Sequence, residues 1–375
     1  MKAVRSTAAA FRRFRATQAD GQPATARLTL ALLGVGWAAV LGALLLHALS
    51  PASAQRVALY PLLVSVVVLG LPHGALDHLV PARLGLAWGR RPLPVTLYLI
   101  GYAALAALYL GLWALAPRLA FVGFLLLTVL HWGQGDQRFL ELFLGRRRPS
   151  RWGAWVTLFV RGALPVAVPV LAFPETAESL YRHAALGLGL PTSALGLSSA
   201  WVAGPLAAVL GAAFAAYAVN AVRAARGRAA LVVDFAELGL LAALFAVLPA
   251  YLAVGIYFTL WHALRHLARL LLLYGAEDGR PGGSARRLWQ LGTDLLPVTF
   301  AALALLAGFY LLNSSRVATL EGFVALYLVL VSALTLPHAV VVALMDRWQV
   351  GLGAASTPAS TKWPVTVPAH RRRLR

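Results

Sequence analysis

The sequence predicts an all-α fold: a polytopic integral membrane helix bundle of about ten transmembrane helices with both termini in the cytoplasm. Three observations carry this prediction. Of the 375 residues, 60% are hydrophobic and only 12% are charged, whereas an ordinary soluble domain has about 25% charged residues. Apolar stretches recur at the length of roughly 20 residues that a helix needs to cross a bilayer. Basic residues gather in alternate connections between these stretches.

The apolar stretches define the spans in order. They cover residues 28–49, 57–79, 93–116, 119–143, 152–172, 198–222, 230–248, 250–274, 290–312 and 319–345. The basic start leads into the first span without the small-residue cleavage site of a secretory signal. We therefore expect a basic cytoplasmic tail (1–27), a single transmembrane domain that carries the functional site (28–347) and a basic, disordered C-terminal tail (348–375).

The distribution of basic residues predicts the orientation. Arginines are dense in the first tail, in every second connection and in the last tail, while the intervening connections contain only Arg56, Arg118, Arg182 and Arg316. The positive-inside rule places the dense connections in the cytoplasm. The net charge of +20 is then explained by topology and by attraction to anionic lipid headgroups, not by nucleic acid. We expect a multi-pass protein of the plasma membrane.

Histidines are the unusual feature of the predicted spans. They are His73, His78, His131, His262, His266 and His338. An ionisable side chain in hydrocarbon is costly and usually serves a function. The chain has no Cys, which excludes thiolate metal sites and cysteine nucleophiles. Taken singly, each histidine could be a helix–helix hydrogen bond; taken together, they predict a metal held by nitrogen ligands inside the bilayer.

The predicted depths of four histidines agree. The second, fourth, eighth and tenth spans all run from outside to inside, and His73, His131, His262 and His338 lie about 12 to 19 residues into them. At 1.5 Å rise per residue, these depths are roughly 18–29 Å from the outer surface. We therefore expect the four imidazoles to meet at one level of the membrane.

Local spacing supports the same site. His262 and His266 are four residues apart and share one helix face, which suits two nitrogens on one ion. Pro72 and Pro337 each precede a histidine, and we expect them to kink their helices. Asp77 follows His73 by about one turn and could orient an imidazole by accepting its N–H.

The surroundings of these histidines are apolar. Trp132, Tyr257, Phe258 and Trp261 flank them and are predicted to form a substrate pocket, with His78 as a candidate outer-shell group. A hydrolytic zinc site would also need a carboxylate base and polar substrate contacts. Imidazole ligands in an apolar pocket favour iron that activates oxygen on an apolar substrate.

Four segments at these histidines resemble a known family. They are Gly70-Leu71-Pro72-His73-Gly74-Ala75-Leu76-Asp77, His131-Trp132-Gly133-Gln134-Gly135-Asp136, Trp261-His262 through His266, and Leu336-Pro337-His338. In this order they resemble the Brp/Blh family of membrane β-carotene 15,15′-dioxygenases, which supply retinal to microbial rhodopsins. The likeness covers about residues 57 to 347. The second segment departs from the family pattern at its variable places, which concerns the pocket wall more than the ligands.

The resemblance implies both site and reaction. His73, His131, His262 and His266 would bind a catalytic Fe²⁺, with His338 as a fifth ligand or pocket residue. O₂ would cleave the central double bond of β-carotene to give two all-trans-retinal molecules, which could be handed to a microbial rhodopsin.

Three alternatives stay open from the residues alone. Another His-ligated membrane oxygenase or desaturase would carry compact His clusters and two irons. A bis-His haem protein would use two of the rings, and a secondary transporter would use intramembrane charges. The candidates for such charges are Asp136, Arg161, Asp234 and Glu237, although Arg161 also fits a buried ion pair with Asp136.

Overall fold

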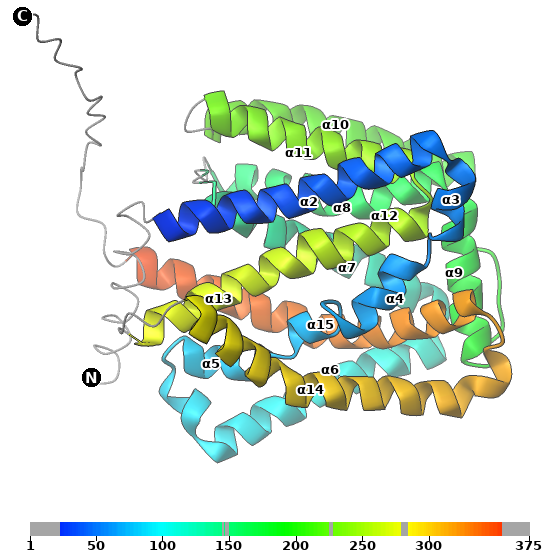
Figure 1. Cartoon of the computed structure of the whole chain (residues 1–375). Coiled ribbons are helices and arrows are strands. Elements are labelled where there is room, and N and C mark those ends of the chain that lie inside the picture. Colours follow the sequence, from blue (N-terminus) through cyan, green and yellow to red (C-terminus); the bar gives the residue numbers. More distant parts are fainter. Residues whose placement is uncertain (1–22, 145, 147–149, 225–227, 279–283, 355–375) are drawn as a thin grey trace, which may run out of the picture.

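The computed structural model describes residues 23–354 except 145, 147–149, 225–227 and 279–283. These residues form helices and turns without any β-strand, and the helices pack side by side as one bundle (Figure 1). The predicted all-α polytopic bundle is confirmed.

Nine described segments are long and apolar enough to cross a membrane. Eight are single helices: α2 (Pro23–Leu49), α6 (Pro92–Leu115), α7 (Pro117–Leu142), α8 (Arg151–Ala172), α10 (Ala200–Ala224), α11 (Arg228–Val247), α14 (Ser284–Asn313) and α15 (Leu320–Ala354). The ninth runs from Pro51 to Arg83.

The predicted eighth span is helical but is not one of these nine. Pro249 ends α11 and caps α12 (Ala250–Ile256), which continues as a π-helical segment, η4 (Tyr257–Ala263), and as α13 (Leu264–Asp278). Arg265, His266 and Arg269 lower the apolar character of α13. The run lies beside α2 and α11, so it belongs to the bundle (Figure 1).

The predicted span 57–79 is not one continuous helix. It consists of α3 (Pro51–Arg56), α4 (Tyr60–Val67), the short 3₁₀ turns η1 (Pro72–Gly74) and η2 (Asp77–Leu79), and α5 (Val80–Arg83). His73 therefore lies in a short turn, not in a helix kinked at Pro72.

Glycine explains the break. Gly70 N–H donates to Ser65 O at 2.6 Å, and a Cβ at Gly70 would lie only 2.8 Å from Tyr327 Oη and 2.9 Å from the Phe258 ring. Only glycine allows the chain to pass so close to its neighbours. Pro72 then lacks the N–H that a continuing helix would need.

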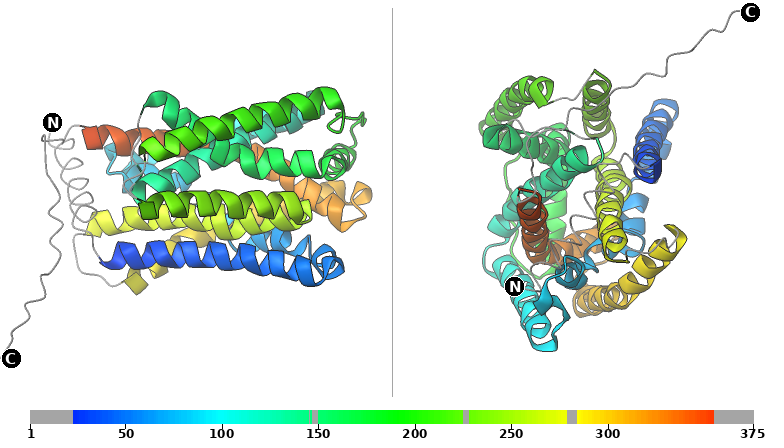
Figure 2. Two further views of the ribbon diagram at one scale, coloured as in Figure 1. Left: turned by 90° about the horizontal axis from the view of Figure 1, so that it is seen from above. Right: turned by 90° about the vertical axis from the view of Figure 1, so that its left-hand side faces the viewer.

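The bundle has an inner and an outer set of helices. In α2, α6, α10 and α14, between 6% and 17% of the most apolar window is buried, whereas α8 and α15 reach 56% and 50%. The outer helices are apolar on their exposed sides, as expected for helices that face lipid. The end-on view in Figure 2 shows α15, in red, lying among the other helices.

Both ends of the described chain lie at one end of the bundle, while α9 (Pro174–Gly187) lies across the opposite end (Figures 1 and 2). We call the end at which the described chain begins and finishes the basic end, and the opposite end the α9 end. Helix α2 begins at Pro23 and α15 continues to Ala354, past the predicted tail boundaries at 27 and 347. Proline favours the first turn of a helix, and no proline follows Arg347 until Pro358. The remaining tail residues, 1–22 and 355–375, lie outside the described residues.

Candidate metal centre

Five imidazoles meet inside the bundle. His73 comes from η1, His131 from α7, His262 from η4, His266 from α13 and His338 from α15, and each is at most 8% exposed. The His338 ring centroid lies 4.7 Å from that of His131, 5.0 Å from that of His73 and 5.2 Å from that of His266. The His131 and His262 centroids are 4.9 Å apart. The structure thus brings together all five histidines that the sequence singled out as ligands or as a fifth ligand.

Three of these rings have the spacing of a metal site. His73, His131 and His262 each offer one ring nitrogen, and these nitrogens lie within 4.8 Å of one another. Metal–imidazole bonds of about 2.0–2.1 Å, as for zinc, bring ligand nitrogens to about 3–4 Å, so small side-chain movements suffice.

The lack of hydrogen-bond partners at several ring nitrogens also fits a bound cation. Both nitrogens of His131 and of His266 and the Nε2 atoms of His262 and His338 are buried without a hydrogen-bond partner among the described residues. A buried polar atom left unpaired costs about 1–3 kcal/mol. A metal ion bound by neutral imidazoles would remove this cost, and nitrogen ligands suit iron, zinc, copper or nickel.

Two of the rings are oriented by hydrogen bonds from their other nitrogen. His338 Nδ1 donates to Asp77 Oδ2 at 2.7 Å, and His73 Nδ1 donates to Gly70 O. Each bond keeps the proton on Nδ1, so Nε2 keeps its lone pair for a ligand. Asp77 therefore orients the histidine of α15, while a backbone carbonyl orients His73.

Sequence reasoning missed the tyrosines that support Asp77. Tyr102 Oη donates to Asp77 Oδ2 and Tyr98 Oη to the Asp77 carbonyl, each at 3.1 Å. Their spacing of four residues on the predicted third span was the available signal. His78 donates from Nδ1 to Ala75 O at 2.9 Å and lies at the cavity wall, without a ring contact to the five.

The π-helical turn and a glycine shape the space around His262. The wider η4 turn carries Phe258 and His262, whose rings stack at 6.2 Å; such turns often mark functional sites. On α7, a Cβ added to Gly135 would come within 3.4 Å of His262 Cε1. The backbone of α7 therefore forms a wall against this ring.

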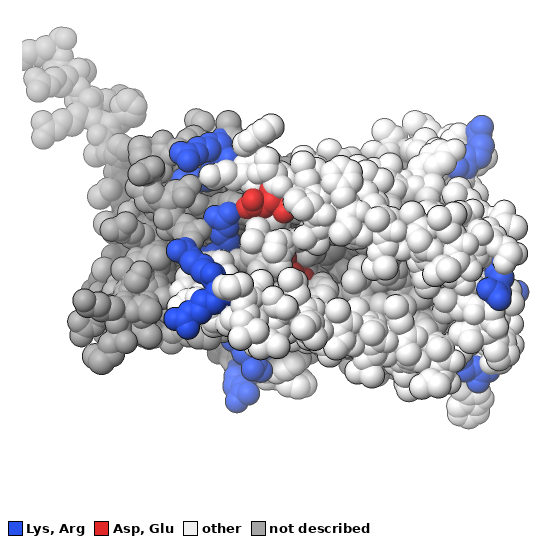
Figure 3. Space-filling view, turned by 90° about the horizontal axis from the view of Figure 1, so that it is seen from below, with Lys and Arg blue, Asp and Glu red and all other residues white. Residues whose placement is uncertain are grey.

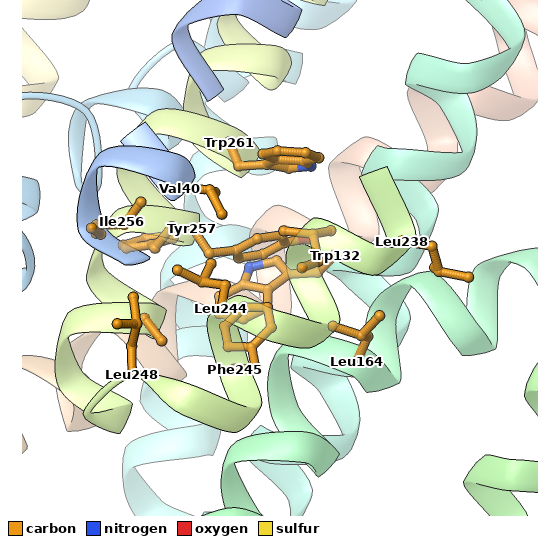
Figure 4. Packing of buried hydrophobic residues seen from close by; sticks show 14 of the residues in the cluster. Val40, Trp132, Leu164, Leu238, Leu244, Phe245, Leu248, Ile256, Tyr257 and Trp261 are labelled. Atoms are coloured by element: carbon orange, nitrogen blue, oxygen red, sulfur yellow. The ribbon is translucent and has the colours of Figure 1, made fainter. Parts of the chain in front are cut away.

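An apolar cavity of about 370 Å³ opens beside the histidines. Its wall includes His73, His131 and His338 together with Trp132 and Phe258, two of the four predicted pocket residues. The other two, Tyr257 and Trp261, do not line it. They pack behind Trp132 in the largest hydrophobic cluster, as Figure 4 shows. The Tyr257 ring contacts that of Phe245 with centroids 5.4 Å apart, and Trp261 Nε1 donates to Asp136 Oδ1, so these contacts hold both side chains away from the cavity.

Buried charges lie behind the histidines. Arg161 pairs with Asp136, Asp234 and Glu237, Arg265 pairs with Asp136 and Glu237, and Arg146 pairs with Asp234. Three arginines thus face three carboxylates, so the predicted Arg161–Asp136 pair belongs to a larger neutral network. Asp136 also accepts from Trp261 Nε1 at 3.1 Å. Every charge is paired, as burial requires, and this favours a structural role over an ion path.

A second network lies between α7, α13 and α15. Arg269 and Arg138 both pair with Asp346, and Arg138 also pairs with Glu141. Arg265 and Arg269 follow His262 and His266 by three residues each, so the helix presents histidines and arginines on neighbouring faces. This repeat was visible in the sequence.

Fold and site together define the class: a polytopic membrane protein with a histidine-rich centre beside an apolar cavity. Comparison with known proteins gives the family. The model of the β-carotene 15,15′-dioxygenase family matches residues 64–346, and the chain belongs to this family. The resemblance of the four histidine segments is confirmed.

Two relatives come from Halobacterium salinarum. One, named probable β-carotene 15,15′-dioxygenase Blh, is 38% identical over 346 residues, which are 87% of this chain and 96% of the relative. The other, named probable β-carotene 15,15′-dioxygenase Brp, is 30% identical over 315 residues, or 76% and 82% of the two chains. No solved structure matches the chain.

Proposed function

We propose that this protein is a non-haem Fe(II) dioxygenase that cleaves the central 15,15′ double bond of β-carotene and forms two molecules of all-trans-retinal. The observation that carries the proposal is the convergence of five buried imidazoles, most with unpaired nitrogens, on an apolar cavity in a chain of this family. The reaction balances without a further reductant, because each oxygen atom of O₂ ends in one aldehyde.

The protein's own residues would hold the ion and keep water away. His73, His131 and His262 would bind Fe²⁺, with His266 and His338 as further ligands. When bound, the ion would supply the activation of O₂. Asp77 and Gly70 O hold two rings with Nε2 available, while Trp132 and Phe258 give the substrate an apolar wall. No side chain has to act as an acid or a base.

Access to the cavity suits a substrate dissolved in lipid. The cavity wall reaches the outer helices α6 and α14 through Leu99, 46% exposed, and Val298, 37% exposed. Figure 3 shows the face formed by these helices: its middle is almost free of basic atoms, and a recess there exposes acidic atoms. A wholly apolar polyene can therefore enter sideways from the bilayer between α6 and α14.

The proposal includes a membrane and a destination for the product. With the basic end in the cytoplasm, the protein lies in the plasma membrane as a multi-pass protein. Retinal released into that bilayer is available for hand-over to a microbial rhodopsin.

Expression in cells that make β-carotene tests the proposed function. The orange pigment should bleach and retinal should accumulate, while the His262→Ala variant should insert into the membrane, retain no stoichiometric iron and leave the pigment intact. Wild-type protein that is well expressed and iron-loaded but leaves β-carotene unchanged would refute the proposal. A Soret band in the purified protein would favour a haem protein instead.

A further inference from the structure

The cavity is not a compact space around the histidines but a long shaft. Eight of its lining residues repeat every three or four positions on two helices. They are Phe121, Phe124, Thr128 and His131 on α7, and Leu328, Val331, Thr335 and His338 on α15. This spacing is one face of a helix. Since α7 and α15 run in the same direction (Figure 1), their stripes form two walls of one passage from the histidines toward the α9 end.

The helix geometry gives the depth of the shaft. Phe121 precedes His131 by ten residues, and Leu328 precedes His338 by ten. At 1.5 Å rise per residue, both walls extend about 15 Å beyond the histidines. This is comparable with the length of a retinoid chain, or one half of β-carotene.

Helix α9 closes this end. It lies across the bundle axis (Figure 1), and three of its residues, Thr176, Ala177 and Leu180, complete the cavity wall. Tyr181, on the same helix, contacts Phe121 with ring centroids 5.6 Å apart and is only 1% exposed. Glu178 accepts the backbone N–H groups of Leu195 and Leu197 at 3.0 and 3.1 Å, which ties α9 to the segment that follows it. The end of the shaft is therefore a fixed wall.

The other side of the histidines leads to the opening between α6 and α14. Trp113 Nε1 of α6 donates to Ser332 Oγ of α15 at 2.8 Å, which aligns these antiparallel helices. His338 lies six residues beyond Ser332, or about 9 Å toward the basic end. Leu99, at the opening, lies fourteen residues before Trp113, or about 21 Å the same way. The histidines thus lie between the open side and the shaft.

We propose that α9, through Thr176, Ala177 and Leu180, is the stop that sets which double bond of a polyene lies at the histidines. The inference rests on the proposed function and deepens it: one end of the carotenoid enters the shaft until α9 halts it, and the shaft depth selects the central bond. A shallower shaft would bring an off-centre bond to the histidines. Cleavage there would still place one oxygen atom in each of two aldehydes, now unequal in length.

Retinal binding tests the stop without any turnover. In Ala177→Phe, a phenyl ring projects into the end of the shaft; Ala172→Phe, at an exposed position five residues earlier, is the matched control. Binding of all-trans-retinal and of a C15 aldehyde with the same ring is measured by quenching of tryptophan fluorescence in the purified full-length proteins. We expect Ala177→Phe to weaken retinal binding by about tenfold or more, since a few carbon atoms no longer fit, with the C15 aldehyde unaffected. The control should match wild type for both.

Three results overturn the inference or its basis, and they are distinguishable. Equal retinal affinity in Ala177→Phe and Ala172→Phe overturns the stop. If Ala177→Phe binds neither aldehyde, the stop is also overturned, because the substitution would then act on the whole cavity and not on its length. If the wild-type protein binds neither aldehyde and cleaves no β-carotene, the proposed function itself is contradicted. In carotenoid-producing cells, we expect Ala177→Phe to lower the share of retinal among the aldehyde products, while Ala172→Phe keeps the wild-type share.

Discussion

His338 is the ring through which a buried carboxylate is connected to the histidine cluster. Its ring contacts three of the other four imidazoles. Its Nδ1 is held by Asp77, which in turn accepts from Tyr102. A carboxylate that fixes a histidine proton in this way orients the ring and keeps the other nitrogen unprotonated for a metal. The chain Tyr102–Asp77–His338 therefore acts on the ligand geometry from outside the cluster.

Replacement of Asp77 by Asn tests this chain. The amide keeps the size of the side chain but no longer fixes the proton on His338 Nδ1. We expect iron affinity to fall about 10- to 100-fold, measured by titration of the metal-free protein with Fe²⁺ and checked by retinal yield. The same change at Asp294, a partly exposed partner of Arg83, is the control. Iron affinity equal to wild type in Asp77→Asn would show that the carboxylate does not act on the site.

Gly135 gives a second test at the residue scale. A Cβ there would lie 3.4 Å from His262 Cε1, already in van der Waals contact, so the γ-methyl groups of a larger side chain must displace the ring. Because small misplacements of catalytic groups are costly, we expect Gly135→Val to lower the rate of retinal formation roughly tenfold at unchanged expression. The control, Gly111→Val, adds the same side chain where a Cβ has nothing within 4 Å. Identical rates for the two variants would contradict the proposed wall.

At the scale of elements, the crossing of α7 and α8 holds His131 in place. A Cβ at Gly133 would lie 1.8 Å from Leu158 O, and one at Gly162 would lie 1.8 Å from Val129 O. Small residues on both helices thus let their backbones meet, as is common where membrane helices pack. The buried ion network reinforces the contact, because Arg161 of α8 pairs with Asp136 of α7.

Gly133→Ala should therefore separate the two helices. Overpacking of a tight interface typically costs about 1–3 kcal/mol and occasionally more, so we expect a clearly lower midpoint of thermal unfolding in detergent. Gly239→Ala, on α11 with nothing within 4 Å, should leave the midpoint at the wild-type value or above. An unchanged midpoint in Gly133→Ala would mean that the helices can separate at little cost.

The elements also show what the sequence could predict. Hydropathy and charge predicted the long helices. The similar depths in four spans predicted that His73, His131, His262 and His338 would lie together. The break of the second span escaped this reasoning, because Gly70 is needed there for contacts with Tyr327 and Phe258, residues nearly 200 or more positions away. The partner of Asp77 escaped for the same reason: a periodic pattern along one helix cannot say which ring of another helix its side chain meets.

At the scale of the whole molecule, the arrangement of polar and apolar surfaces matches a reaction on a lipid-soluble substrate. The ion networks and the orienting hydrogen bonds lie in the interior, and the outer helices expose apolar side chains such as Leu97, Leu108, Phe300 and Leu311. The polar groups needed to build the site are thereby hidden from lipid, where each would be costly. The cavity wall reaches the lipid-facing side of the bundle at Leu99 of α6 and Val298 of α14.

The proposed entrance can be blocked at Ala302. This residue of α14 lines the cavity, whereas the adjacent Ala301 is exposed on the outer side of the helix. In Ala302→Trp, the indole should obstruct the gap toward α6, so that retinal forms more slowly from β-carotene dissolved in liposomes. Iron content should stay at the wild-type level, because the histidines are untouched. Ala301→Trp adds the same side chain toward lipid and should keep the wild-type rate.

If both variants were equally active, the substrate would have to reach the histidines by another route, and the α9 end of the shaft would be the next route to test. A slow Ala302→Trp with a normal Ala301→Trp would instead establish that the bilayer delivers the substrate through the side of the bundle.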